Sequence, residues 1–404
     1  YDFLEDLVGK ENIVMAQVHY DEDTPHLQAY FLPIVNEVKR KVFETLLYET
    51  EYANIADSKY VEERLSLLRK WIKDNMPTKL YRYRRCNENS ISAFSKDEIW
   101  GSSYLTFNDS LECIPCYDLN KVNDIFNKEF DTEIIERNIS QLKEGYLPSG
   151  IKELCSSEFI NNLQNNAKQD ISQRELEKQL QRLKNTLVTY ISNNLSEYEK
   201  YFFTGISAAE SQYMVACFSE TNTSSLMWGH YADSHKGFCL EYDLTALISD
   251  CARNCEDIRQ CVALMMSVAI APVIYSKGRF DASSSFTSML MNIVLESATN
   301  KQVGYYYADM LLPIKALLTK SDEWEYEAEW RMYRPLPSLD SLHQCIAKIK
   351  PTAVYRGIKM NIEDKKTIAD IAKDKKIPCY QMVPQYFSST YEIKPVDAPL
   401  FDNQ

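Results

Sequence analysis

Late in the chain, the segment WEYEAEWR at residues 324–331 places three glutamates and an arginine at alternate positions. A strand has a period of two, so this spacing predicts Glu325, Glu327, Glu329 and Arg331 on one face. Neighbouring carboxylates repel one another, and burial of that face would therefore require cationic or hydroxyl partners. Carboxylates held in this way are candidates for the catalytic groups of the protein. The alternative is an edge strand whose acidic face is solvated.

Two other predicted strands supply residue types that could complement these carboxylates. LYRYR at residues 80–84 alternates, so that Arg82 and Arg84 share one face. VACFSE at residues 215–220 ends its strand at Ser219. Arg82 is therefore a candidate to bind an anion, although it could instead form a simple salt bridge to the acidic strand.

A third cluster, SLMWGHYADSHKGFCLEYD at residues 225–243, contains the remaining polar candidates. His230 and Tyr231 lie between Trp228 and a predicted turn, which favours a position at the rim of a cleft. His230 and His235 are five positions apart and do not share a helical face, so a metal held by both is not expected. The aromatic side chains of this cluster are more typical of a core than of a ligand-stacking site.

The order of an early arginine, a serine at the end of a middle strand and a late Glu-x-Glu pair resembles the Arg-Ser-Glu class of ADP-ribosyltransferases. The resemblance implies NAD as the cofactor and no metal, with the arginine at the NAD phosphates. It implies that Glu329 is the catalytic carboxylate, which stabilises an oxocarbenium-like centre as nicotinamide leaves, and that Glu327 assists. The acceptor would be a macromolecule of unknown identity, or NAD would be cleaved. The residues assigned to NAD on this basis are Arg82, Ser219, His230 and Tyr231.

Blocks spread over residues 79–385 resemble a bacterial family called domain of unknown function 2971. Residues 225–243 form the most distinctive block. Membership in this family names no reaction, and it implies a setting in bacterial conflict or phage defence. In chain order the blocks are LYRYR, FNDSLEC, VACFSETNTSSLMWGHYADSHKGFCLEYD, VIYS, WEYEAEWRMYR and AVYRG.

The beginning of the chain, residues 3–45, resembles the plasmid mobilisation relaxases of the MobV (Pre/Mob) type. In that family the pattern H-x-D-E-x-T-P-H-x-H supplies histidines that hold a divalent metal against a DNA phosphate. Here the last histidine is replaced by Gln28, an amide that is a poor substitute for imidazole. His19 and His26 are therefore only degenerate metal candidates, and the segment is expected to persist as a strand pair that packs. The matching residues are His19, Asp21, Glu22, Thr24, Pro25 and His26.

Composition narrows the classes of partner. The net charge of −13 does not favour nonspecific binding of nucleic acid, and 10 glycines without a GxGxxG or Walker A pattern argue against a glycine-rich phosphate loop. No apolar run reaches the roughly 18 residues that a membrane span needs. The 11 cysteines include one isolated CxxC, so zinc is not expected. We expect a reduced, cytoplasmic protein.

Many short strands with interspersed helices predict an α+β fold, with a mixed or antiparallel sheet core and flanking helices. An ADP-ribosyltransferase-like arrangement is one form that such a core could take. The expected organisation is a relaxase-like strand pair at 1–45, a helical connector at 46–78 and a domain at 79–395. A helical insertion at 119–200 interrupts that domain, and one or two further helices are expected over 285–319.

Several other functions remain open from the residues alone. A degenerate plasmid mobilisation relaxase would nick DNA with a metal, and a noncatalytic binding or sensor module would keep the fold without the glutamates. A glycosidase-like pair could be formed by Glu241 or Asp243 with Glu327 or Glu329. Cys217 lies within an apolar strand, where burial would raise its pKa and weaken it as a nucleophile.

Overall fold

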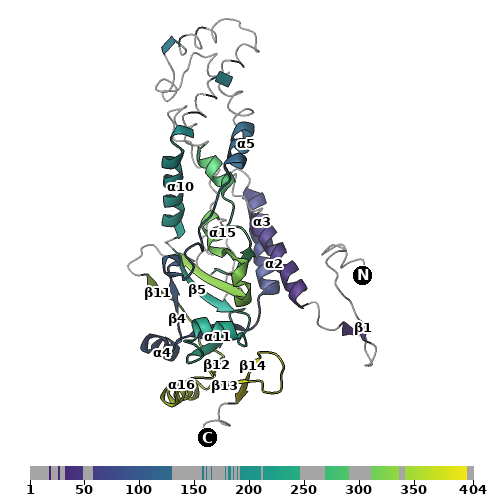
Figure 1. The fold of residues 1–404 in the computed structure, drawn as a ribbon, viewed down its shortest axis with the longest axis vertical. Helices are drawn as coiled ribbons and strands as arrows, with labels where there is room; N and C mark the ends of the chain where they lie inside the picture. The colour runs from purple at the N-terminus through teal and green to yellow at the C-terminus, as the bar shows by residue number, and fades with distance from the viewer. Residues whose placement is uncertain are drawn as a thin grey trace.

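One ten-stranded sheet organises the part of the chain that the computed structural model describes (Figure 1). Strands and helices alternate irregularly along the chain, and most strand pairs are antiparallel, which confirms the predicted α+β class with a mixed sheet. The described residues are 18–19, 26–27, 32–48, 58–129, 192–210, 213–245, 269–290, 311–335 and 342–397, with a few helical positions between 157 and 189.

The main path of the sheet has the order β11-β4-β5-β3-β6-β12-β13-β14, and β10 and β7 branch from it at β5. Within this sheet β12 and β13 are parallel neighbours, and α16 (Ile362–Lys375) forms the crossover between them. The strands, in chain order, are β3 (Leu80–Arg84), β4 (Glu98–Ser102), β5 (Tyr213–Ser219), β6 (Phe238–Tyr242), β7 (Ala269–Pro272), β10 (Glu329–Pro335), β11 (His343–Lys348), β12 (Ala353–Arg356), β13 (Cys379–Pro384) and β14 (Ile393–Asp397).

The sheet splits at β5. Along one edge, β5 pairs with β10 over the whole length of both strands. On the other edge, Val215 pairs with Ser102 of β4, whereas Ser219 pairs with Tyr81 of β3. The strands β3 and β4 therefore diverge around Cys217, and the gap between them is where the candidate site forms.

Two helices near the N-terminus, α2 (Leu32–Tyr48) and α3 (Ser58–Asn75), pack on each other along one flank of the molecule (Figure 1). Phe43 and Leu47 of α2 belong to the same buried cluster as Leu68 and Ile72 of α3 and the central strands. Each fully buried side chain of this kind contributes about 1.5–3 kcal/mol. The helix predicted to end before Pro77 is thus confirmed as α3, and α2 is part of the main core.

The remaining elements surround the sheet. Helices α5 and α10 extend away from it at one end, and α16 lies with β13 and β14 at the other (Figure 1). Residues 283–290 are also helical and overlap the start of the stretch 285–319 where helix was expected. The other elements are α4 (Glu88–Ser95), η2 (Tyr104–Thr106), α5 (Leu119–Glu129), α10 (Leu195–Glu210), α11 (Ser225–Tyr231), β8 (Ile274–Ser276), α15 (Leu312–Leu318), β9 (Thr319–Ser321) and η4 (Asp322–Glu327).

The prediction that WEYEAEWR forms one continuous strand is wrong. A short 3-10 helix, η4, runs to Glu327, and Ala328 adopts a left-handed conformation with φ of 44°. The strand β10 begins only at Glu329. The alternation that placed three glutamates on one face is therefore lost: Glu325 is exposed, whereas Glu327 and Glu329 are buried. β10 is also an internal strand between β5 and β7, which rules out a solvated acidic edge.

The opening segment contains two short strands, β1 (Val18–His19) and β2 (His26–Leu27), which pair antiparallel with His19 and His26 in register. Gln28 lies outside the described residues, as do most of the expected insertion at 119–200 and the cysteines of residues 251–261. Among the helices that the structure describes, none is long and apolar enough to cross a membrane.

Candidate functional site

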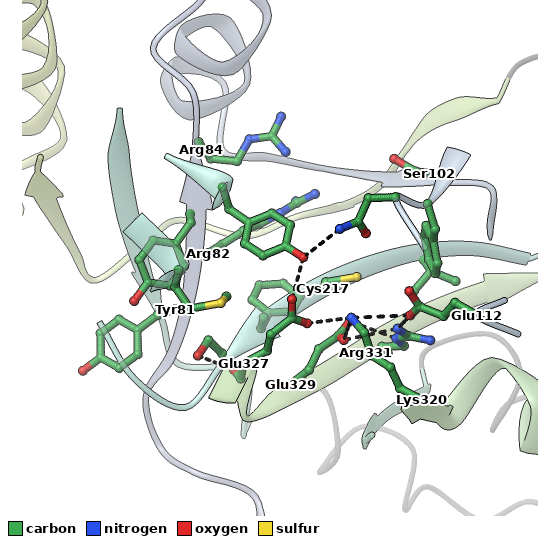
Figure 2. Close-up of a pocket in the computed structure, with 18 of the residues that line it drawn as sticks. Tyr81, Arg82, Arg84, Ser102, Glu112, Cys217, Lys320, Glu327, Glu329 and Arg331 are labelled. Atoms are coloured by element: carbon green, nitrogen blue, oxygen red, sulfur yellow. Dashed lines mark hydrogen bonds and ion pairs between the residues drawn. The ribbon is translucent and has the colours of Figure 1, made fainter. Parts of the chain in front are cut away.

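A pocket of about 280 Å³ opens where β3 and β4 diverge from β5 (Figure 2). Its walls come from five strands (β3, β4, β5, β9 and β10), from the loop around η2, and from α11 and η4. Figure 2 shows the guanidinium groups of Arg82 and Arg84 on one side and a cluster of glutamates, lysine and arginine on the other. The polar and charged lining residues are Tyr81, Arg82, Tyr83, Arg84, Ser102, Thr106, Asn108, Glu112, Cys217, Ser219, Tyr231, Lys320, Glu327, Glu329 and Arg331.

Lys320 lies at the centre of the charged cluster, and only 4% of its side chain is exposed. Its Nζ is 2.6 Å from Glu327 Oε2, 3.1 Å from Glu329 Oε2 and 3.6 Å from Glu112 Oε1. The Trp324 ring covers the ammonium group at 5.1 Å. A buried ammonium needs such partners because desolvation without them would neutralise it. Lys320 therefore joins three carboxylates that would otherwise repel one another.

Arg331 holds two of these three carboxylates, Glu329 and Glu112. Its Nε and Nη2 donate to the two carboxylate oxygens of Glu329 at 2.9 and 3.2 Å. Its Nη2 also pairs with Glu112, and its Nη1 donates to the Leu317 carbonyl. The two-pronged contact fixes the orientation of the Glu329 carboxylate more firmly than a single ion pair would.

Three carboxylates therefore face two cations, which leaves the cluster with one net negative charge when all are ionised. Burial raises the pKa of Glu329 and the charge of Glu327 adds to this effect, although Lys320 opposes it. Burial opposes ionisation of Lys320 as well, but Glu329 and Glu327 outweigh it and raise the pKa of Lys320. A floor of this kind is suited to stabilise a positive charge that develops nearby.

The Glu327 carboxylate is oriented by a hydroxyl from α11. Tyr231 donates its OH to Glu327 Oε1 at 2.5 Å, and Asn108 Nδ2 donates to the Tyr231 oxygen at 3.4 Å. Burial and the neighbouring Glu327 raise the pKa of Tyr231, so its hydroxyl remains a donor. The backbone of Glu327 is also fixed, because Ser219 Oγ donates to its carbonyl at 2.6 Å.

The loop after α11 shows why a glycine is needed at position 237 of the distinctive block at 225–243. Asp233, Ser234 and His235 are three consecutive residues with positive φ, at 49°, 54° and 70°. They bring Gly237 so close to β3 that a Cβ there would lie 2.1 Å from the Arg84 carbonyl. Only glycine fits at such a distance. The block therefore serves to fix α11, and with it Tyr231, against the strand that carries the pocket arginines.

Arg82 and Arg84 form the opposite side of the pocket. Arg82 donates to the Trp100 carbonyl across the split and lies over the Phe218 ring at 5.7 Å. Burial lowers the pKa of Arg82, and burial together with the charge of Arg82 lowers the pKa of Arg84 to about 9. No carboxylate of the described residues pairs with either guanidinium. Two adjacent, partly desolvated cations of this kind favour an anionic ligand.

Cys217 is exposed at the split, which corrects the expectation that it is buried. The pKa of Cys217 is raised, as expected, although its side chain is exposed. The surrounding protein atoms desolvate the thiol, and the negative charge of Glu329 raises the pKa further. Cys217 is thus accessible but protonated at neutral pH, and a weak nucleophile.

The structure brings five of the six predicted catalytic and NAD-binding residues together around one pocket: Arg82, Ser219, Tyr231, Glu327 and Glu329. The sixth, His230, is exposed and packs near the Tyr326 ring, outside the lining set. The cations that neutralise the glutamates are Lys320 and Arg331, so the simple salt bridge from Arg82 that the sequence allowed is absent among the described residues.

The glycosidase-like alternative is not supported by the placement of its residues. Glu241 accepts hydrogen bonds from Tyr355 at 2.6 Å and from Thr352 at 2.9 Å, and it does not line the pocket. Asp243 bonds to Thr245, two residues further on. Trp228 and Phe238 are fully buried, as expected for core aromatics.

Several important residues were missed from the sequence. Lys320 precedes η4 in a segment without strand or helix periodicity, so nothing local pointed to it. Glu112 does fall in the FNDSLEC block, and that block was a usable signal. Among the described residues, no group of three or more His, Cys, Asp or Glu side chains could hold a metal ion.

The fold and the pocket define an α+β protein in which buried ion pairs form the floor of the candidate site. Two family descriptions match its sequence: residues 227–332 match Protein of unknown function (DUF2971), and residues 1–66 match Plasmid recombination enzyme. The chain thus carries a DUF2971 domain together with an N-terminal fragment similar to plasmid recombination enzymes. Both resemblances predicted from the sequence are confirmed, although the DUF2971 match covers a shorter stretch than the expected 79–385 and the N-terminal match a longer one than 3–45.

Among curated proteins, Plasmid recombination enzyme type 1 of Staphylococcus aureus is 34% identical over 65 residues. The match covers 16% of this chain and 16% of that protein, so the chain spans about a sixth of the relative's length. No solved structure matches. The pocket combines residues inside the DUF2971 match, such as Tyr231 and Lys320, with residues outside it, such as Arg82 and Ser219.

Proposed function

We propose that the pocket binds NAD and cleaves the bond between nicotinamide and ribose, with transfer of ADP-ribose to a macromolecule or to water. One observation carries the proposal: one side of the pocket has two guanidinium groups that no carboxylate of the described residues pairs with, and the other side has a net negative carboxylate cluster. A dinucleotide has the complementary arrangement, since its diphosphate is anionic and its nicotinamide ribose is the part that becomes positive during the reaction.

The arginine side would hold the diphosphate. Arg82 and Arg84 project from the same face of β3, and neither is neutralised by a carboxylate of the described residues. Phosphate oxygens would satisfy both guanidinium groups and remove the repulsion between them. Ser102 and Thr106 also line the pocket.

The carboxylate side would act on the ribose. As the C1′–N bond breaks, its electron pair leaves with nicotinamide and positive charge develops on the ribose. The net charge of the cluster stabilises that charge, and Lys320 and Arg331 hold the carboxylates in place so that little reorganisation is needed. The acceptor then forms a bond to C1′ and gives up its proton, for which Glu327 is a suitable base because Tyr231 already orients it.

The strand register supports the same assignment. Ser219 is the cross-strand partner of both Glu329 in β10 and Tyr81 in β3, next to Arg82. Arginine, serine and glutamate thus come from three neighbouring strands, in the order that the Arg-Ser-Glu transferases use along their chains. Consumption of NAD is also an activity that a phage-defence or toxin role could use.

The test compares Glu329→Gln with Glu325→Gln, because the first residue is buried in the pocket and the second is exposed in η4. Wild-type protein is incubated with NAD labelled in the adenylate part, with and without cell extract, and free nicotinamide and protein-bound label are measured. We expect turnover that falls on the order of a hundredfold in Glu329→Gln and is unchanged in Glu325→Gln. Binding of NAD without turnover by the wild-type protein would favour a sensor module, and absence of binding would reject the proposal.

A further inference from the structure

We propose that Arg40 of α2, in the segment similar to plasmid recombination enzymes, is a positioning residue that holds Glu329 in the pocket. The inference rests on the proposed function only in that Glu329 is taken as the reactive carboxylate. It assigns a role to the N-terminal segment that is unrelated to DNA or metal binding.

The main chain of Glu329 is held on both sides by residues that Arg40 contacts. The Glu329 N–H donates to the Tyr275 hydroxyl at 2.8 Å, and its carbonyl accepts from the Val273 N–H at 2.9 Å. Arg40 Nη1 donates to the Val273 carbonyl at 2.6 Å, and the guanidinium lies 5.4 Å from the centre of the Tyr275 ring. One side chain therefore reaches both supports of Glu329.

A second set of contacts converges on the neighbours of Glu329. Arg40 Nη2 is 2.8 Å from Glu220 Oε1, and the same oxygen accepts from Trp330 Nε1 at 2.8 Å. The Glu220 N–H donates to the Ala328 carbonyl at 3.0 Å. The residues immediately before and after Glu329 are thus both bonded to Glu220, whose carboxylate Arg40 holds.

Partial burial strengthens the contacts of Arg40. Only 16% of the Arg40 side chain and 25% of the Glu220 side chain are exposed, so the pair is partly shielded from solvent. Such charge-assisted bonds are stronger than neutral ones. The adjacent Lys41 differs, because its side chain is 71% exposed and pairs with Glu44 on the same helix. Lys41 is therefore a matched control.

A separate contact from the same helix supports the inference. The Tyr48 hydroxyl is 2.8 Å from Thr319 Oγ1, and Thr319 directly precedes Lys320. The helix α2 thus contacts the residue before Lys320 and the residues that support Glu329. Arg40 and Tyr48 both lie within the matched residues 1–66. The N-terminal segment therefore packs behind a pocket whose floor lies mostly in the DUF2971 match.

The first test does not depend on NAD. Amide hydrogen exchange at residues 328–330 is compared in wild type, Arg40→Met, Arg40→Lys and Lys41→Met. Loss of the Arg40 contacts should speed exchange at these amides on the order of tenfold, with partial rescue in Arg40→Lys and no change in Lys41→Met. Unchanged exchange at 328–330 in a folded Arg40→Met protein overturns the inference. If Arg40→Met does not fold, Arg40→Lys and Glu220→Gln carry the test, and wild-type exchange in both overturns it.

The second test uses NAD turnover. A displaced Glu329 should lower kcat on the order of tenfold and leave KM nearly unchanged, since the arginines that bind the phosphates are untouched. A rise in KM at constant kcat overturns the positioning role. If the wild-type protein consumes no NAD, the proposed function fails, whereas faster exchange at 328–330 in the Arg40 variants would still support the positioning of Glu329.

Discussion

Glu329 and Ser219 lie directly opposite each other in the antiparallel pair of β10 and β5. Ser219 is at the same time the register partner of Tyr81, so three strands meet at one point of the sheet. Glu329 begins its strand and Ser219 ends its own, which places both at the edge of the split. Residues more than a hundred positions apart in the sequence therefore line one pocket.

Arg84 should bind the anionic part of the ligand. We expect Arg84→Gln to weaken binding of ADP-ribose on the order of tenfold or more, because a charge-assisted hydrogen bond to phosphate is lost. The control is Arg85→Gln, since Arg85 is exposed and lies next to Arg84 at the end of the strand. Isothermal calorimetry gives both dissociation constants. Equal affinity in the two variants would show that Arg84 does not contact the ligand.

Lys320 should be essential to the stability of the pocket. Lys320→Met leaves Glu327 and Glu329 buried beside each other without their shared cation, and we expect a loss of about 3–5 kcal/mol in the free energy of unfolding at pH 7. Lys348→Met, at a site that is 71% exposed, should change stability by less than about 0.5 kcal/mol. Urea denaturation measures both.

The pH dependence of Lys320 follows from the direction of its pKa shift. Its pKa is raised above the ordinary value of 10.5, so the stabilisation is fully present below that value and is lost as pH rises through the folded-state pKa. The difference between wild type and Lys320→Met should therefore shrink at strongly alkaline pH. It should also shrink at acid pH, where the carboxylates become protonated. A difference that is constant with pH would contradict the role of the ion pairs.

Cys217 should be accessible yet slow to react. Its raised pKa predicts that alkylation by iodoacetamide at pH 8 is at least about ten times slower than for a free cysteine peptide, and that the rate is still rising above pH 9. Glu329→Gln removes the negative charge beside the thiol and should speed the reaction. Peptide mass spectrometry follows this one cysteine among the others. Fast alkylation in the wild type would mean that the thiol is not desolvated.

Ala328 should be a strained position. Its left-handed conformation, with φ of 44° and ψ of 53°, suits glycine better than alanine. We expect Ala328→Gly to raise the free energy of unfolding by about 0.5–1 kcal/mol. Ala369→Gly, inside α16, should lower it by a similar amount, because glycine is unfavourable in a helix. Thermal denaturation of both variants measures these opposite changes in stability. Destabilisation by Ala328→Gly would contradict the strain at this position.

Much of the fold could be read from local patterns. The alternation in LYRYR predicted β3, and the helical spacing before Pro77 predicted α3. These elements follow from periods of two and 3.6, which short windows reveal. The same reasoning failed at WEYEAEWR, because a 3-10 turn that ends in a left-handed alanine happened to carry alternating residues.

The candidate site could be predicted only in part. The alternating glutamates indicated that cationic or hydroxyl partners were needed. The sequence suggested Arg82 as that partner, whereas the structure uses Lys320 and Arg331. His230 was predicted at the rim of a cleft because it lies with Tyr231 between Trp228 and a predicted turn. In the structure the helix α11 turns Tyr231 toward Glu327 and leaves His230 exposed. Side-chain direction on one turn of helix cannot be settled without knowing which face packs.

The two family resemblances, the α+β class and the residue types of the site could all be recognised from the sequence. These properties follow from composition, short motifs and the periodicity of nearby residues, which can be read without knowledge of the tertiary structure. The packing of distant segments brings β3 and β10 to β5 at Ser219, splits the sheet at Cys217, and lets Arg40 contact Val273 and Glu220, which support Glu329. These relations depend on pairing and burial between distant segments, where many registers satisfy the local pattern and the packing of the whole core selects one.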